Sequence, residues 1–266
     1  MKKIIENNKN YLLFFLILIS ILFFFNTIAK GISNSCDFQW QPATLFWEGV
    51  NHYQKFIKNG KYDYMCQGGE YAHLLNVIYF PFTLLKWESA KIAWLIFNIF
   101  FTFFIPFLIC KKFKISNYKT IILILIFMSC HPTRMTINYG QQSLLVMFFL
   151  MLPFIIKSSS SYFFSGFSSI KYSTGYILFL NFLASKEYKK FILATVPYLL
   201  GWLIYSFYTS SDPLVNFFEP FRWFLRISYE RQAIDLYTLG ELYFSFKNNI
   251  LYKTLLILLI FLINFF

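Results

Sequence analysis

The chain has 266 residues, of which 58% are hydrophobic and 23% are aromatic, and its mean hydropathy is +0.53. A soluble domain cannot bury this much apolar surface, whereas a protein that faces lipid need not bury it. The apolar segments are continuous and do not alternate with polar residues, which excludes a membrane β-barrel. The composition therefore predicts an all-α, multi-pass membrane protein.

The formal net charge is +12, and many of the lysines stand beside apolar segments. Residues 111–114 read "KKFK" and residues 186–190 read "KEYKK". Basic clusters in these places are typical of cytoplasmic loops that face anionic lipid. We find no nucleic-acid-binding module, so we expect the lipid bilayer as a partner and no nucleic acid.

The first apolar segment, residues 11–29, follows a basic N-terminus. It is long enough to cross a bilayer of about 30 Å at 1.5 Å per residue. No clean cleavage site follows it, so we expect an uncleaved first span with a cytoplasmic N-terminus. Residues 30–88 would then form a first extracytoplasmic loop. Within it, apolar residues at helical spacing predict an amphipathic helix over 42–59, lying along the membrane surface.

The middle of the chain alternates between apolar segments and short polar connections. Residues 89–110 predict a second span, and residues 120–130 with their flanks a third that runs outward. Residues 131–142, "HPTRMTINYGQQ", then form an outer loop, and residues 143–156 return inward. The serine tract 158–161 predicts a short inner turn.

The next two apolar segments, residues 162–170 and 173–184, are each too short to cross a membrane, and Lys171 lies between them. We interpret them as short or broken helices, which line cavities in membrane proteins, with Lys171 at depth or near the outer side.

The C-terminal part begins with residues 191–208, which predict a span that runs outward, and residues 209–250 form a second extracytoplasmic loop. Residues 251–266 begin a last span in which the chain stops. We therefore expect a single domain over residues 1–266, truncated at its C-terminus.

Metal and disulfide patterns are weak. The four cysteines contain no CxxC pair, and the three histidines have no zinc-binding spacing. We therefore expect no metal and no cofactor. Cys36 and Cys66 share the first loop and would be free to pair if that loop is periplasmic, but loop proximity alone does not bring two thiols together.

The conspicuous polar residues are all predicted on the outer side: Asp37, Arg134, Gln141, Lys171 and Arg222. A carboxylate just beyond a first helix suits a general base that takes a proton from a sugar hydroxyl. Arginine and lysine at the same membrane face suit a lipid phosphate. Together these residues predict glycosyl transfer from a lipid-linked sugar in a cavity at the membrane surface.

Three segments resemble one family, in the same order along the chain. Residues 36–53, "CDFQWQPATLFWEGVNHY", residues 139–152, "YGQQSLLVMFFLML", and residues 163–180, "FFSGFSSIKYSTGYILFL", are similar to motifs of glycosyltransferase family 87. Ser143 stands where that family often has asparagine.

This resemblance implies a GT-C fold in the bacterial inner membrane with an extracytoplasmic active site. It implies a polyprenyl-phosphate sugar donor, with mannose as the hexose, a glycan or glycolipid acceptor, and inversion at the anomeric carbon. Asp37 would be the catalytic base. Gln141 and Lys171 match motif positions and would organise the donor or the cavity. We expect Arg134 and Arg222 to help bind the phosphate of the donor.

Each of these residues also has a purely structural interpretation. Asp37 could cap a helix, as aspartate often does, and Gln141 could simply begin one. Arg134 and Lys171 could anchor at lipid headgroups, and Arg222 could lie on a solvated face. The alternatives to an enzyme are a transporter or flippase of lipid-linked sugars and a non-catalytic membrane fragment of such an enzyme.

Overall fold

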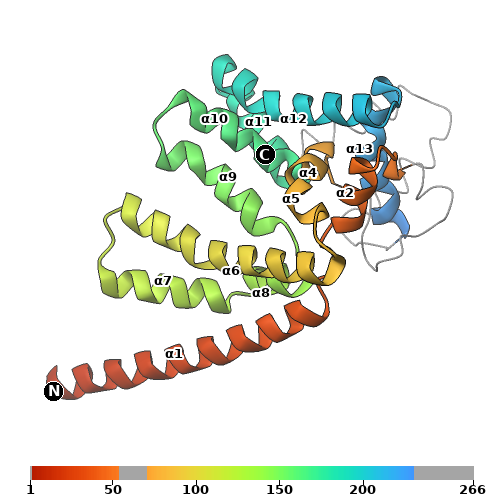
Figure 1. Ribbon diagram of the computed structural model, residues 1–266. Coiled ribbons are helices and arrows are strands. Elements are labelled where there is room, and N and C mark those ends of the chain that lie inside the picture. Colours follow the sequence, from red (N-terminus) through yellow and green to blue (C-terminus); the bar gives the residue numbers. More distant parts are fainter. Residues whose placement is uncertain (1, 54–70, 231–266) are drawn as a thin grey trace.

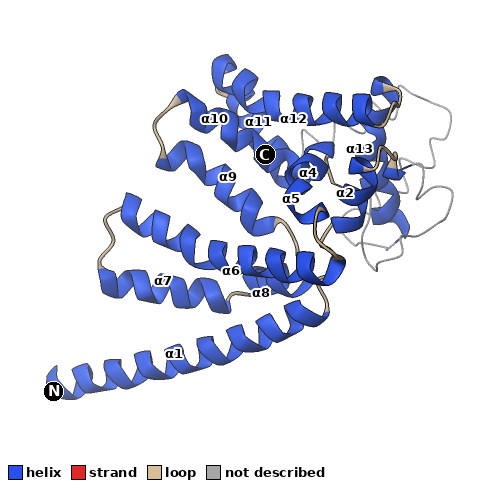
Figure 2. Cartoon of the chain, in the orientation of Figure 1, coloured by secondary structure: helices blue, strands red, loops and turns tan. Residues whose placement is uncertain are grey.

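The computed structural model describes residues 2–53 and 71–230, and this part of the chain is built from helices without a strand (Figures 1 and 2). The helices are α1 (Lys2–Ser33), α2 (Trp40–Trp47), α4 (His73–Ile78), α5 (Phe80–Thr83), α6 (Trp87–Lys112), α7 (Asn117–Ser129), α8 (His131–Tyr139), α9 (Ser143–Ile155), α10 (Ser159–Ser165), the 3₁₀ helix η1 (Gly166–Ile170), α11 (Tyr172–Ala184), α12 (Tyr188–Tyr208) and α13 (Pro213–Glu230).

Three helices in the described part are long and apolar enough to cross a membrane: Leu13–Ser33, Trp87–Lys112 and Tyr188–Tyr208. They correspond to the predicted spans at 11–29, 89–110 and 191–208. Their outward faces carry large apolar side chains, such as Phe14 and Phe25 of α1, each 66% exposed. Such surfaces suit lipid, and the predicted all-α membrane fold is confirmed.

The prediction of an outer loop at residues 131–142 was wrong, because residues 131–139 form α8. Helices α7 and α8 are bent by 53° at a short break and form a fourth candidate span if counted together. Pro132 stands in the first turn of α8, where its missing N–H leaves no hydrogen bond unmade. Gly140 ends the helix with a left-handed φ of 69°.

The segment between α1 and α6 also differs from its prediction. The helix predicted over 42–59 begins earlier and ends at Trp47, because the following Gly49 has a φ of 76° that a helix cannot continue through. Residues 54–59 lie outside the described residues, as do Cys66 and the predicted last span at 251–266.

The polar segments predicted as turns and loops are partly helical. The serine tract starts α10 at Ser159 and is therefore more than a turn, and the predicted loop from residue 209 contains α13. The interpretation of residues 162–184 as broken helices is confirmed: α10 continues as η1, Lys171 is the N-cap residue of α11, and α11 follows.

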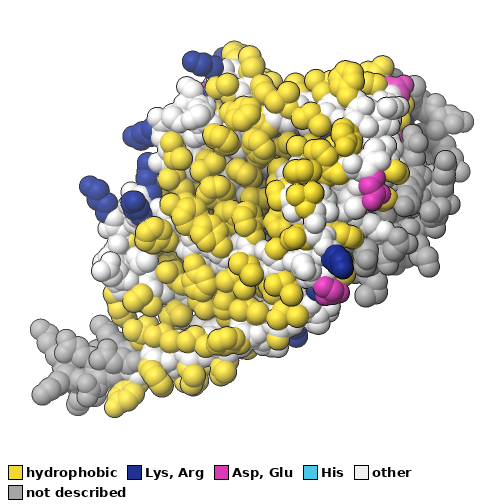
Figure 3. All heavy atoms as spheres, viewed as in Figure 1, with side chains coloured by type: hydrophobic (Ala, Val, Ile, Leu, Met, Phe, Trp, Pro, Cys, Tyr) yellow, Lys and Arg dark blue, Asp and Glu magenta, His cyan; other side chains and the backbone are white. Residues whose placement is uncertain are grey.

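The two ends of the helix bundle differ in charge. The connections α6–α7, α9–α10 and α11–α12 lie at the end where α1 begins, on the left of Figure 1. We call this the basic end, and it carries Lys111, Lys112, Lys114, Lys119, Lys157, Lys186, Lys189 and Lys190. Figure 3 shows the dark-blue side chains mostly there, the acidic ones at the opposite end, and an apolar belt between them. The helices thus have the charge distribution of a protein set across a bilayer.

Candidate functional site

Asp37 lies at the end opposite the basic end, in the short connection between α1 and α2. Its backbone N–H donates to the carbonyl of Tyr139 at 2.7 Å, and the N–H of Ser35 donates to the carbonyl of Asn138 at 3.1 Å. These bonds tie the exit of α1 to the last turn of α8. The backbone of Asp37 is therefore fixed by a neighbouring helix rather than held in a free loop.

An aromatic stack beside Asp37 makes this connection rigid. Phe38 is fully buried and stacks on Trp94 of α6, with ring centroids 5.5 Å apart and an interplanar angle of 4°. The indole N–H of Trp94 donates to the carbonyl of Gly140 at 2.8 Å. A Cβ at Gly140 would lie 3.0 Å from the Cβ of Phe38, so only glycine allows this close approach. The residue next to Asp37 is thus locked into the core.

The half-buried carboxylate of Asp37 accepts hydrogen bonds on both oxygens. The side-chain amide of Gln39 donates to Oδ1 at 3.0 Å. The hydroxyl of Tyr71, which lies 34 positions along the chain, donates to Oδ2 at 3.0 Å. These two hydrogen bonds hold the carboxylate in one orientation.

Gln142 binds the backbone of Asp37. Its buried amide Nε2 donates to the backbone carbonyl of Asp37 at 3.1 Å and to the hydroxyl of Tyr79 at 2.9 Å. Burial raises the pKa of Tyr79 well above its usual value; the Gln142 hydrogen bond lowers it in part, and the Asp37 charge raises it further. Tyr79 therefore stays a neutral hydroxyl near the carboxylate, and Gln142 links this hydroxyl to the backbone of Asp37.

Lys171 contacts the residue that follows Gln142. Its Nζ donates to the hydroxyl of Ser143 at 2.9 Å, and Ser143 is the first residue of α9, directly after Gln142. The N–H of Ala72, next to Tyr71, donates to the carbonyl of Ile170 at 3.2 Å. Backbone and side chains together close a circuit, which we call the polar ring: Asp37, Tyr71, Lys171, Ser143 and Gln142.

The other three sequence candidates have contacts of a different kind. Arg134 lies over the ring of Phe23 at 4.8 Å and its Nε donates to Thr27 at 3.4 Å, so it packs on α1.

Gln141 is half-buried, and its backbone N–H closes the end of α8 by donating to Thr136. Arg222 is exposed on α13 and faces Glu219 at 3.5 Å. The structure thus brings Asp37 and Lys171 into the polar ring. The observed contacts of Arg134, Gln141 and Arg222 are with α1, α8 and α13 instead.

Sequence reasoning missed Tyr71, Gln39, Tyr79 and Gln142 as neighbours of Asp37. Tyr71 is 34 positions away, and no local pattern connects the two residues. Gln142 had a signal, because it stands beside Gln141 in the same motif. Gly140 comes just before the two glutamines, and its left-handed backbone decides which of them points inward. A glycine at this position is a common signal for the end of a helix.

A second polar cluster lies where α4, α12 and α13 meet. The hydroxyl of Tyr205 accepts from the backbone N–H of His52 at 3.2 Å and lies 2.9 Å from its Nδ1. The Nε2 of His73 lies 2.7 Å from the carbonyl of Asn216, which can only accept, so Nε2 carries the hydrogen. The rings of His73 and Tyr205 stack at 4.2 Å.

Burial keeps both histidines of this cluster uncharged. It lowers the pKa of His73 to about 4, although the bond to Asn216 opposes this. Burial also lowers the pKa of His52 well below its usual value, and the neighbouring His73 lowers it further. Within residues 2–53 and 71–230, no group of three His, Cys, Asp or Glu side chains could hold a metal ion. The cluster therefore joins helices and is not a metal centre of the described part.

Comparison with known proteins identifies a family. A model of glycosyltransferase family 87 matches residues 74–265, well over half of the chain. Comparison with curated proteins and with solved structures found no match. The matched region contains Gln142, Ser143 and Lys171 of the polar ring, and Asp37 and Tyr71 precede it.

Proposed function

The chain belongs to glycosyltransferase family 87 and is therefore a membrane glycosyltransferase, for which we propose a polyprenyl-phosphate hexose as donor. The hexose is proposed to be mannose and the acceptor a hydroxyl of a glycan or glycolipid. The observation that carries this proposal is the polar ring, which joins one carboxylate and one ammonium at a single end of the bundle.

In the proposed reaction, Asp37 acts as the general base. Its carboxylate takes the proton of the acceptor hydroxyl while that oxygen attacks C1 of the donor sugar. The bond from C1 to the phosphate oxygen breaks, and the electron pair leaves with the polyprenyl phosphate. A single displacement of this kind inverts the anomeric centre through an oxocarbenium-like transition state. Positioned proton transfer contributes about 10²–10⁴-fold to such a rate.

The surroundings of Asp37 support this role by holding the carboxylate in place. Gln39 and Tyr71 each donate to one oxygen, and Gln142 fixes the backbone carbonyl. Hydrogen bonds from Gln39 and Tyr71 orient the carboxylate. A base fixed in this way loses less freedom in the transition state than a mobile side chain does.

Lys171 is the proposed partner of the donor phosphate. Its ammonium donates to Ser143, and Lys171 is the N-cap residue of α11. The charge that develops on the leaving phosphate is stabilised by such a cation. We rank Arg134, Gln141 and Arg222 behind Lys171 as phosphate-binding candidates, because their observed contacts lie with α1, α8 and α13.

The proposed site is extracytoplasmic. The lysine-rich connections lie at the opposite end of the bundle, and such loops stay on the cytoplasmic side of bacterial inner membranes (Figure 3). A donor whose lipid tail stays in the bilayer would reach a site at the membrane surface without a soluble nucleotide carrier.

Reconstitution tests the donor class directly. Purified chain in liposomes would receive a glycolipid acceptor with either polyprenyl-phosphate-mannose or GDP-mannose. We expect product from the lipid-linked donor and none from the nucleotide sugar. The Lys171→Gln variant should raise the KM for the lipid-linked donor, whereas Lys119→Gln, at the basic end, should not. Transfer from GDP-mannose at an equal rate would contradict the proposal.

A further inference from the structure

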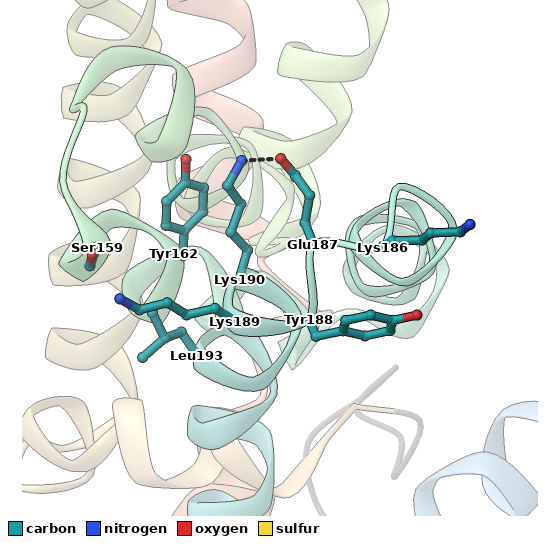
Figure 4. Close-up of a pocket in the computed structure, with 8 residues that line it drawn as sticks. All are labelled: Ser159, Tyr162, Lys186, Glu187, Tyr188, Lys189, Lys190 and Leu193. Atoms are coloured by element: carbon teal, nitrogen blue, oxygen red, sulfur yellow. Dashed lines mark hydrogen bonds and ion pairs between the residues drawn. The ribbon is translucent and has the colours of Figure 1, made fainter.

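A pocket of about 410 Å³ lies at the basic end, far from the polar ring. It is formed by the start of α10 and by the connection from α11 into α12. Figure 4 shows the side chains that line it: Ser159, Tyr162, Lys186, Glu187, Tyr188, Lys189, Lys190 and Leu193. A volume of this size is within the range of small-molecule sites, about 300–1,000 Å³.

Most of the pocket surface is apolar, and its charged side chains are mainly cationic. It contains three lysines against one glutamate, together with the hydroxyls of a serine and two tyrosines. Lys190 pairs with Glu187 and lies 5.0 Å from the ring centre of Tyr162. These contacts hold the Lys190 ammonium in a fixed direction, so that part of its ordering entropy is already lost before a ligand binds.

Lys189 is the second cation of the pocket. Figure 4 shows it extending beside Leu193 on the side of Ser159, whereas Lys186 and Tyr188 point away from this group. Within residues 2–53 and 71–230, Lys189 makes no ion pair. Lys189 and Ser159 therefore border one side of the pocket, and Lys190, Glu187 and Tyr162 border another.

The surroundings of the pocket point to a lipid rather than a soluble anion. α12 is a candidate membrane span that begins at Tyr188, so the pocket lies at the depth where this span would meet the headgroups. Large apolar side chains are exposed close by: Ile192 is 60% exposed, Phe164 46% and Leu183 44%. Basic pockets between membrane helices on the cytoplasmic side are suited to anionic headgroups, and flanking apolar surface is suited to acyl chains.

We propose that this pocket binds the phosphate of an anionic phospholipid headgroup, with Lys189 and Lys190 as its cationic ligands. Ser159 and Tyr162 donate hydrogen bonds to the phosphate oxygens, and the acyl chains lie along the exposed apolar faces of α10 and α12. The site is independent of the glycosyl-transfer site, because it lies at the other end of the bundle and shares no residue with the polar ring.

The test compares two lipids and two double variants in detergent-purified full-length chain. Retention of phosphatidylglycerol and of phosphatidylcholine is measured by native mass spectrometry. The pocket variant is Lys189→Gln with Lys190→Gln. The matched control is Lys111→Gln with Lys119→Gln, which removes the same charge from the same end without touching the pocket. Far-ultraviolet circular dichroism checks that each variant is folded.

The wild type and the control should retain phosphatidylglycerol in preference to phosphatidylcholine, and the pocket variant should bind it about tenfold or more weakly. Equal losses in the two variants would show diffuse surface attraction and overturn the proposal. It would also be overturned if wild type shows no preference for phosphatidylglycerol, or if millimolar inorganic phosphate displaces the lipid, which would mark a site for free anions.

Discussion

Asp37 stands where its side chain could have been a simple helix cap, and the contacts show another arrangement. The N-cap residue of α2 is Gln39, and α2 has no side-chain capping bond. The carboxylate instead accepts hydrogen bonds from Gln39 and from the distant Tyr71. Bringing a tyrosine from another segment onto a carboxylate costs conformational entropy. The Tyr71 contact therefore favours a functional site at Asp37 over a local helix cap.

Replacement of Gln142 should destabilise the fold more than replacement of its neighbour. Gln142→Leu removes a donor to the buried hydroxyl of Tyr79 and to the carbonyl of Asp37, which keeps a longer bond of 3.3 Å from Gln39. An unsatisfied buried polar group costs about 1–3 kcal/mol. We expect a clear drop in thermal unfolding temperature.

The control is Gln141→Leu, whose side chain is half-buried and whose backbone bond is kept. Its unfolding temperature should stay close to that of the wild type. Equal losses in the two variants would mean that Gln142 has no special part in holding Asp37.

At the residue scale, the sequence marked Asp37 and Lys171 as site candidates through motif position and expected membrane side, and their roles stay predictions. It was not sufficient for Tyr71 or Ser143. The contact of Ser143 with Lys171 depends on how α9 and α11 pack. The contact of Tyr71 with Asp37 requires two positions 34 residues apart to come together in the fold. Such long-range geometry leaves no trace in local spacing.

At the element scale, continuous apolar runs predicted the spans well, since α6 extends only two residues beyond its predicted range at each end. Bends and short helices were harder. Residues 131–139 are polar enough for a loop, yet packing of α8 against α1 and α6 stabilises a helix there. The prediction for residues 42–59 failed because Gly49 stops α2 first.

The buried histidines that join α4, α12 and α13 predict an acid-sensitive fold. They are neutral in the folded chain, with the pKa of His73 lowered to about 4 from 6.5. In the unfolded chain they bind protons below about pH 6.5. The unfolded state therefore binds more protons, and stability falls as the pH drops from about 6.5 toward 4.

Thermal unfolding at pH 7.5 and pH 5 measures this effect. His73→Phe keeps a ring for stacking on Tyr205 and removes the titrating group. The variant should lose less stability between the two pH values than the wild type, whatever its stability at pH 7.5. An unchanged difference would show that His73 does not contribute to the acid sensitivity.

At the scale of the whole molecule, separation of charge between the two ends predicts the topology. Glu48, at the end that carries Asp37, and Lys157, at the basic end, are both exposed. In a chain whose native cysteines are replaced by serine, Glu48→Cys should react with a membrane-impermeant maleimide in intact cells.

The companion variant Lys157→Cys should react only after the cells are permeabilised, because positively charged connections stay in the cytoplasm. Protein gels that resolve the labelled form provide the readout. The reverse labelling pattern would place Asp37 on the cytoplasmic side and would contradict an extracytoplasmic site.

The role of Asp37 as the base for glycosyl transfer is tested most directly by the turnover of Asp37→Asn in liposomes with saturating polyprenyl-phosphate-mannose. The amide keeps the shape of the carboxylate but cannot take the acceptor proton. We predict a rate about 10²–10⁴-fold below that of the wild type, at an unchanged unfolding temperature. Asp212→Asn, which alters an exposed carboxylate that caps α13, should keep the wild-type rate. A folded Asp37→Asn protein with wild-type turnover would contradict the account.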